Sequence, residues 1–148
     1  MNVFSSHLPL LLQIAATLQL GVAVLNLFLI RLLHWREDIS RMPLLLREVF
    51  QIHVWFISIT LAIFGVMTCR FAGEIANGQN PVGQWLAAGI GMFWGIRTVL
   101  QVTYYSGSHW RGLPGRTLAH CALLIVYGGF TALYLWAAFA SPAALTPR

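Results

Sequence analysis

Long apolar runs alternate with short polar segments along the whole chain of 148 residues. Four of the runs are almost free of charged residues over about 20 positions each, the length that a helix needs to cross the hydrocarbon core of a bilayer. The pattern therefore predicts an all-α integral membrane protein in which four transmembrane helices form a bundle. The predicted spans are residues 8–33, 47–69, 83–106 and 117–140.

The composition agrees with this pattern. The chain is 58% hydrophobic and 9% charged, whereas a soluble domain carries about 25% charged residues to keep its surface wet. Four spans and their connections use nearly all of the sequence, so we expect a single transmembrane domain over residues 1–148. We expect the first span to be retained, because no basic segment precedes it as in a signal peptide. Any chemistry then lies in or beside the lipid bilayer.

The charges predict an orientation. All nine basic residues are arginine, and the arginines gather around the first and third connections. The positive-inside rule places both connections in the cytoplasm and both termini outside, in the cell membrane, with the inner membrane of a bacterium as the expected location. Because these arginines alternate with lipid-facing spans, we expect them to contact lipid headgroups and not nucleic acid. They are Arg31, Arg36, Arg41, Arg47, Arg111 and Arg116.

A short motif occurs twice. His34-Trp35-Arg36 recurs as His109-Trp110-Arg111, and in each copy an arginine follows five residues later, at Arg41 and Arg116. The spacing indicates two related helical hairpins, as in transport proteins built from parallel repeats. The alternative is that Trp and Arg recur simply because both are common at membrane interfaces.

Residues that break helices mark the connections. Pro43 lies near the predicted start of the second helix, and the segment 77–81, Asn-Gly-Gln-Asn-Pro, is typical of a tight turn. The segment 112–115, Gly-Leu-Pro-Gly, has the same character. We therefore expect short turns between the second and third spans and between the third and fourth.

Small residues on the third span predict close helix packing. Ala87, Gly91 and Gly95 follow one another at four-residue spacing, which leaves one helix face nearly bare. In membranes such a face allows another helix to approach closely. That helix could belong to this chain, to a second copy in a homo-oligomer or to a partner membrane subunit. Gly128 and Gly129 are expected to act in the same way on the fourth span.

Arg97 is the charged residue nearest the middle of a span. An unpaired charge at that depth costs on the order of 3 kcal/mol or more. Gln101 and Tyr104 follow toward the cytoplasm at helical spacing, and Tyr105 and Ser108 extend the stripe. In one interpretation Arg97 reaches toward water along this stripe and pairs with Glu48. In the other it binds the anionic end of a ligand.

Two histidines are expected at matching depth. His53 and His120 each lie a few residues inside a cytoplasmic arginine, on spans that run in the same direction. Two imidazoles on separate helices could hold haem b, with an arginine near its propionates. With Gln51, Gln101 and Tyr127 they could instead hold the carbonyls of a quinone. The alternative is that each histidine only satisfies a hydrogen bond between helices. The candidate cofactor-binding residues are Glu48, Gln51, His53, Arg97, Gln101, Tyr104 and His120.

Other chemistry has little support in the sequence. Only Glu37, Asp38 and Glu48 supply carboxylates on the cytoplasmic side, and no spacing of His, Cys or carboxylates suits zinc or a di-iron centre. No nucleophile motif or phosphate-binding glycine loop occurs, so no catalytic residue is proposed.

Three functions stay open from the sequence. The first is a cofactor-binding or lipid-binding protein, with haem b or quinone as ligand, that serves as a membrane redox or anchor subunit. The second is a non-enzymatic structural or interaction subunit of a membrane complex. The third is a channel or transporter for small solutes, formed by oligomerisation.

Overall fold

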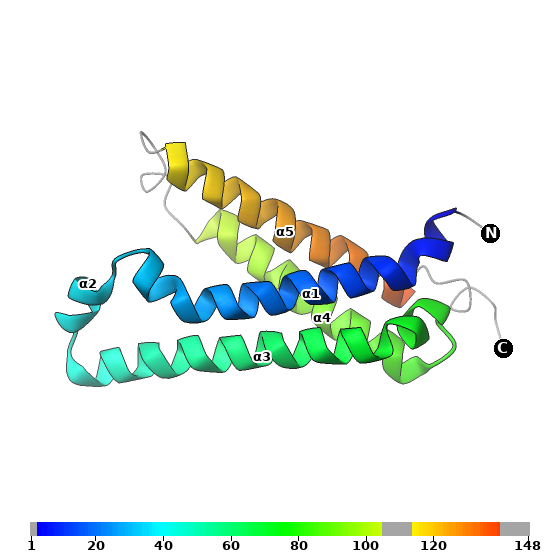
Figure 1. The fold of residues 1–148 in the computed structure, drawn as a ribbon, viewed down its shortest axis with the longest axis horizontal. Coiled ribbons are helices and arrows are strands. Elements are labelled where there is room, and N and C mark those ends of the chain that lie inside the picture. Colours follow the sequence, from blue (N-terminus) through cyan, green and yellow to red (C-terminus); the bar gives the residue numbers. More distant parts are fainter. Residues whose placement is uncertain (1–2, 105–113, 140–148) are drawn as a thin grey trace. The chain divides into compact units, whose positions relative to one another are not determined.

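The computed structural model describes residues 3–104 and 114–139, and every regular element in them is a helix (Figure 1). Four helices in this part of the chain are long and apolar enough to cross a membrane, which confirms the predicted all-α class with its four spans. The short helix between the first two was not predicted. The helices are α1 (Val3–Leu32), α2 (Arg36–Ser40), α3 (Leu44–Asn77), α4 (Pro81–Thr103) and α5 (Pro114–Phe139).

Helix α3 is longer than the predicted span 47–69. Its 34 residues measure about 51 Å at about 1.5 Å per residue, against roughly 30 Å of hydrocarbon. The prediction ended the span at its flanking charges, Arg47 and Arg70. Backbone hydrogen bonds continue past a charged side chain, and the Arg47 N–H already donates to the Pro43 carbonyl over 3.1 Å. The charges therefore mark the apolar window and not the ends of the helix.

Helix α1 ends in a Schellman turn centred on a histidine. His34 has a φ of 56°, in the left-handed region that glycine usually occupies at this position. The His34 N–H donates to the Arg31 carbonyl over 3.3 Å, and the Trp35 N–H to the Ile30 carbonyl over 3.1 Å. These two bonds satisfy carbonyls that the end of a helix leaves open, and α2 begins directly afterwards.

The turn between α3 and α4 confirms the predicted break at 77–81. Gly78 follows the last residue of α3 with a φ of 65°. The Asn80 side chain caps α4 by accepting the Val82 N–H over 2.9 Å, and Pro81 is the first residue of the helix. Gln84 donates its side-chain amide back to the Gly78 carbonyl over 3.1 Å.

Contacts divide the chain into two compact units. Gln13–Arg70 form the α1–α3 unit, and Met1–Leu12 with Phe71–Arg148 form the α4–α5 unit. The predicted bundle, the single domain and the repeat stay predictions, and the second copy of the repeated motif, residues 109–111, lies outside the described residues.

In the α1–α3 unit, polar side chains of α1 bind the facing helix. Gln19 donates its amide N–H to the Leu61 carbonyl over 3.3 Å. Asn26 donates to the Val54 carbonyl over 3.1 Å and to the Ser58 hydroxyl over 2.9 Å. The helices are also close at Gly65, where an added Cβ would lie 2.8 Å from the Leu20 side chain. Hydrogen bonds and one bare glycine thus hold this pair together.

In the α4–α5 unit, the small face of α4 packs on α5. A Cβ added to Gly91 would lie 2.8 Å from Leu135 Cδ2, and one added to Gly95 would lie 3.3 Å from Thr131 Cγ2. The predicted close packing is confirmed, and its partner is a helix of the same chain. At Gly128 and Gly129 an added Cβ would meet nothing within 4 Å among the described residues, so the same expectation for the fourth span stays a prediction.

Hydroxyl side chains in the spans bind their own helices. Each donates to the carbonyl four residues earlier, over 2.8 to 2.9 Å. This local bond satisfies a hydroxyl in an apolar setting without a partner helix. The residues are Thr17, Ser58, Thr60, Thr98, Thr103 and Thr131.

Candidate functional site

The predicted site residues fall into two groups. Arg97, Gln101, Tyr104 and His120 belong to the α4–α5 unit, while Glu48, Gln51 and His53 lie on α3 in the α1–α3 unit. Haem ligation by both histidines and the pairing of Arg97 with Glu48 each require residues from both units. Those two interpretations stay predictions.

One face of α4 carries the residues that meet α5. Trp94, Arg97 and Gln101 are spaced by three and four positions, so their side chains lie along a single helix face. Trp94 is 1% exposed and Gln101 is 2% exposed. A glutamine buried this deeply between apolar helices needs hydrogen-bond partners for its amide.

Gln101 has a partner for only one half of its amide. Its Nε2 lies 2.9 Å from Nδ1 of His120 on α5. In this orientation of the amide its nitrogen donates and His120 Nδ1 accepts. Gln101 Oε1 is buried and accepts no hydrogen bond from any described residue. Leaving such an acceptor unsatisfied costs about 1–3 kcal/mol, and a ligand that carries a donor hydrogen would remove that penalty.

Arg97 lies over an aromatic stack. Its guanidinium carbon is 5.2 Å from the centroid of the Tyr127 ring, within the range of a cation–π interaction. Trp94 stacks on the same tyrosine, with centroids 5.0 Å apart and ring planes at 29°. The centroid of the Phe130 ring lies 4.9 Å from that of Trp94, with the two ring planes at 51°. The ring face offers the cation a neutral contact inside the span.

The predicted polar stripe does not continue uniformly along α4. Gln101 is buried, whereas Tyr104 is 81% exposed although it lies only three residues further on. Tyr105 and Ser108, the other members of the stripe, lie outside the described residues. Gln101 is thus the last described residue of the stripe that faces α5.

The α3 residues do not form one site among themselves. Glu48, Gln51 and His53 are all exposed. Gln51 and His53 are two positions apart on a helix, so they point to nearly opposite sides. Gln51 lines a cavity with three arginines, and His53 does not. Among the described residues, no three His, Cys, Asp or Glu side chains gather as a metal site would require.

A shallow apolar groove of about 490 Å³ runs along α4 beside Leu135. It ends at Leu100, the residue before Gln101. Its dimensions and apolar walls suit a hydrocarbon chain more than a polar solute. The lining residues are Gly91, Met92, Gly95, Ile96, Val99, Leu100 and Leu135.

Sequence reasoning missed Trp94, and it did not pair Gln101 with His120 or Arg97 with Tyr127. The signal was present in the spacing. His120 and Tyr127 are seven residues apart and share one face of α5, as Trp94 and Gln101 share one face of α4.

Comparison with known proteins gives no further indication of function, because no family model, no curated protein and no solved structure matches this chain.

Proposed function

We propose that this multi-pass membrane protein binds a quinone at the Gln101–His120 pair. The observation that carries the proposal is the buried Gln101 Oε1, an acceptor without a donor among the described residues, beside the His120 ring. The reduced quinol headgroup supplies the missing donor, whereas the oxidised quinone can only accept. A ring carbonyl accepts from His120 Nε2–H, and a quinol hydroxyl donates to Gln101 Oε1.

The same geometry favours quinone over haem b. An iron ligand must offer an unprotonated ring nitrogen, usually with the other nitrogen donating to a neighbouring acceptor. Here Nδ1 faces an amide nitrogen, and if Nδ1 accepts, the nitrogen left for iron would be the one that carries the hydrogen. Turning the Gln101 amide would free Nε2 for iron and would move the unsatisfied group from the amide oxygen to the amide nitrogen.

The surroundings of the pair suit a lipid-soluble molecule. The apolar groove along α4 reaches Leu100, on a different side of the helix from Gln101, and could hold an isoprenoid tail. Arg97 and its aromatic stack lie one helical turn deeper. In this proposal the chain is an anchor subunit that holds the quinone for a partner subunit of a redox complex, or for a second copy of itself.

The test is extraction of the purified chain. We expect solvent extracts of the wild type to contain quinone by mass spectrometry, and those of Gln101→Leu to have lost most of it. Gln84→Leu is the matched control, because that glutamine lies on the same helix and binds only the turn at Gly78. A short-chain benzoquinone, added in its reduced quinol form, should raise the apparent Tm of wild type and control, and leave Gln101→Leu unchanged, because only the quinol can donate to Gln101 Oε1.

Two outcomes overturn the proposal. A Soret band in the absence of quinone would replace quinone by haem b. A colourless, ligand-free and stable oligomer, with no response to added benzoquinone, would favour the non-enzymatic structural subunit.

We also propose an orientation in the cell membrane of a bacterium, with both termini outside. It rests on the arginines around the first and third connections. The turn at Gly78 is then extracytoplasmic. The native Cys69 and Cys121 are free and exposed, so both are first replaced by alanine. In this cysteine-free background, a cysteine placed at Gly78 should react with an impermeant thiol reagent added outside intact cells. Labelling from the cytoplasmic side alone would invert the orientation.

A further inference from the structure

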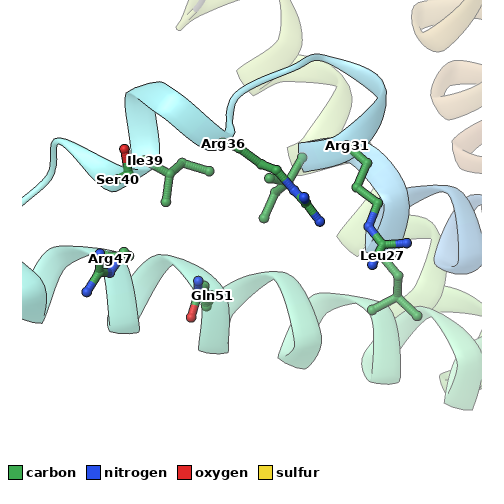
Figure 2. A pocket seen from close by; sticks show the side chains of 8 residues that line it. Leu27, Arg31, Arg36, Ile39, Ser40, Arg47 and Gln51 are labelled. Carbon is green, nitrogen blue, oxygen red and sulfur yellow. The ribbon is translucent and has the colours of Figure 1, made fainter.

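A second polar feature, in the α1–α3 unit, is a cavity of about 420 Å³ where α1, α2 and α3 meet. Each of these helices supplies one arginine to its lining: Arg31 from α1, Arg36 from α2 and Arg47 from α3. Figure 2 shows the side chains of Arg31 and Arg36 extending toward α3, which carries Arg47 and Gln51. Three cations from separate elements therefore converge on one space.

The local backbone creates this convergence. Helix α1 ends at Leu32, one residue after Arg31, and after the Schellman turn at His34 α2 begins at Arg36. Ile39 is 6% exposed and anchors the short helix by its apolar side chain. Arg36 and Arg31 are brought to one cavity because the chain reverses between them, and a continuous α1 would separate them.

The cavity lining holds no carboxylate. The acidic residues of the same segment, Glu37, Asp38 and Glu48, are exposed and do not line it. Within the part of the chain that the structure describes, none of the three lining arginines is in an ion pair. Like charges gathered without counterions repel, so the cavity attracts an anion.

The remaining lining is apolar. Leu27 and Ile30 of α1 are half-buried, and with Ile39 they form one side of the cavity. A molecule that fits has an anionic group for the arginines and a hydrocarbon part for the leucine and isoleucines. Gln51 and Ser40 add neutral hydrogen-bonding groups.

We propose that this cavity binds the phosphate of an anionic phospholipid. Guanidinium groups match phosphate oxygens with paired hydrogen bonds, so three of them favour phosphate over a neutral or zwitterionic headgroup. Basic pockets between transmembrane helices at the cytoplasmic face bind anionic headgroups. Both lining helices α1 and α3 are membrane spans, and the cavity lies at the end of α1. This site is separate from the proposed quinone site, and neither depends on the other.

The test compares arginines inside and outside the cavity. The full chain is purified in detergent and titrated with phosphatidylglycerol, and bound lipid is counted by native mass spectrometry. Arg36→Gln and Arg47→Gln should each weaken binding about fivefold, the effect of about 1 kcal/mol per basic residue. Arg41→Gln is the matched control, since it removes the same charge from the same connection but does not line the cavity.

Further measurements identify the ligand class and check that each variant is folded. Phosphatidylcholine should bind far more weakly than phosphatidylglycerol to the wild type and equally to all variants. Arg36→Lys and Arg47→Lys keep the charge and the fold, and should bind with intermediate affinity because an ammonium lacks the planar fork. Circular dichroism checks helix content in every variant.

Three results would overturn the proposal. Equal loss in Arg41→Gln and the cavity variants would leave only general attraction of arginines to an anionic surface. Unchanged binding in both cavity variants would place the lipid elsewhere. If inorganic phosphate stabilises the wild type but not the cavity variants, with no greater effect from phosphatidylglycerol, the ligand would be a soluble phosphate compound.

Discussion

The α1–α3 pair and the α4–α5 pair both bury an amide side chain against a facing helix, yet the two amides end in different states. Asn26 on α1 donates twice to α3, to a backbone carbonyl and to the Ser58 hydroxyl. Gln101 on α4 reaches one ring nitrogen of His120 and leaves its oxygen without a donor among the described residues. The amide nitrogen of the half-buried Asn26 thus has two acceptors on the facing helix, whereas Gln101 keeps a fully buried oxygen without a donor among the described residues.

The difference separates two reasons for a polar residue inside a membrane span. A side chain whose hydrogen bonds are all met by the neighbouring helix contributes to packing and needs no ligand. A buried acceptor that stays open carries a penalty that a ligand with a donor hydrogen would remove. By this criterion the α4–α5 pair is the better candidate for ligand binding.

The largest expected effect is on packing in the α4–α5 pair. Gly91→Leu forces a Cβ to within 2.8 Å of Leu135 Cδ2 and 3.1 Å of its backbone nitrogen, and overpacking of this kind costs about 1–3 kcal/mol or more. The apparent Tm in detergent should fall clearly. Gly89→Leu is the control, because an added Cβ there meets nothing within 4 Å. Equal losses in both variants would contradict close packing at Gly91.

The next effect contrasts the two amides directly. Asn26→Leu removes two hydrogen bonds to α3 and should destabilise the protein by about 0.6–1.7 kcal/mol per bond. Gln101→Leu removes an unsatisfied oxygen together with one bond, so we expect little change in quinone-free protein. Thermal unfolding of both variants after quinone extraction measures the contrast. A larger loss in Gln101→Leu would show that its amide is structural and reverse the comparison.

A smaller effect concerns Arg97 and its aromatic partner. Arg97→Leu should stay folded, because the contact with Tyr127 is worth about 0.5–2 kcal/mol. A double-mutant cycle with Tyr127→Leu measures that coupling, and additive losses would mean that the contact contributes nothing. Arg97→Leu and Arg97→Lys should both lower the amount of extracted ligand. Identical ligand profiles in wild type and variants would separate Arg97 from the site.

The smallest effect is at the turn of the α1–α3 unit. His34→Gly relieves a left-handed conformation that costs an L-residue about 1–2 kcal/mol, but it adds about 0.5–1 kcal/mol of backbone freedom to the unfolded chain. The net gain should be about 0.5 kcal/mol, seen as a slightly higher Tm. His34→Val is the control and should lower the Tm. A lower Tm for His34→Gly would show that the imidazole itself makes stabilising contacts.

The spans were predictable from sequence because hydrophobic length alone determines them. The prediction was too short for α3, since it stopped at Arg47 and Arg70 whereas the helix runs from Leu44 to Asn77. It did not include α2, because five residues are too few to show a helical period. The small face at Gly91 was identified correctly, but Gly128 and Gly129 were not distinguished from it. Spacing shows that a face is small and does not show what faces it.

The site was predictable as a set of residue types and not as contacts. Arg97, Gln101 and His120 were all selected because ionisable and amide groups are rare in spans. Their partners depend on how α5 is rotated about its axis, which no local pattern determines. One interpretation gave Arg97 an acidic partner, which stays a prediction, and the tyrosine ring that lies beneath its guanidinium was not foreseen. The cavity arginines were assigned to topology alone because their convergence depends on the turn at His34.

The hydroxyl groups of the spans have a consequence for proton movement. A chain of hydrogen bonds conducts protons only if each member can accept from one neighbour and donate to the next. Thr98 and Thr131, on the two helices that carry Gln101 and His120, each direct their hydroxyl hydrogen to the carbonyl of their own preceding turn. To relay a proton, each would first have to break that bond in an apolar setting. The α4–α5 pair is therefore better suited to hold a proton donor or acceptor in place than to serve as a proton wire across the membrane.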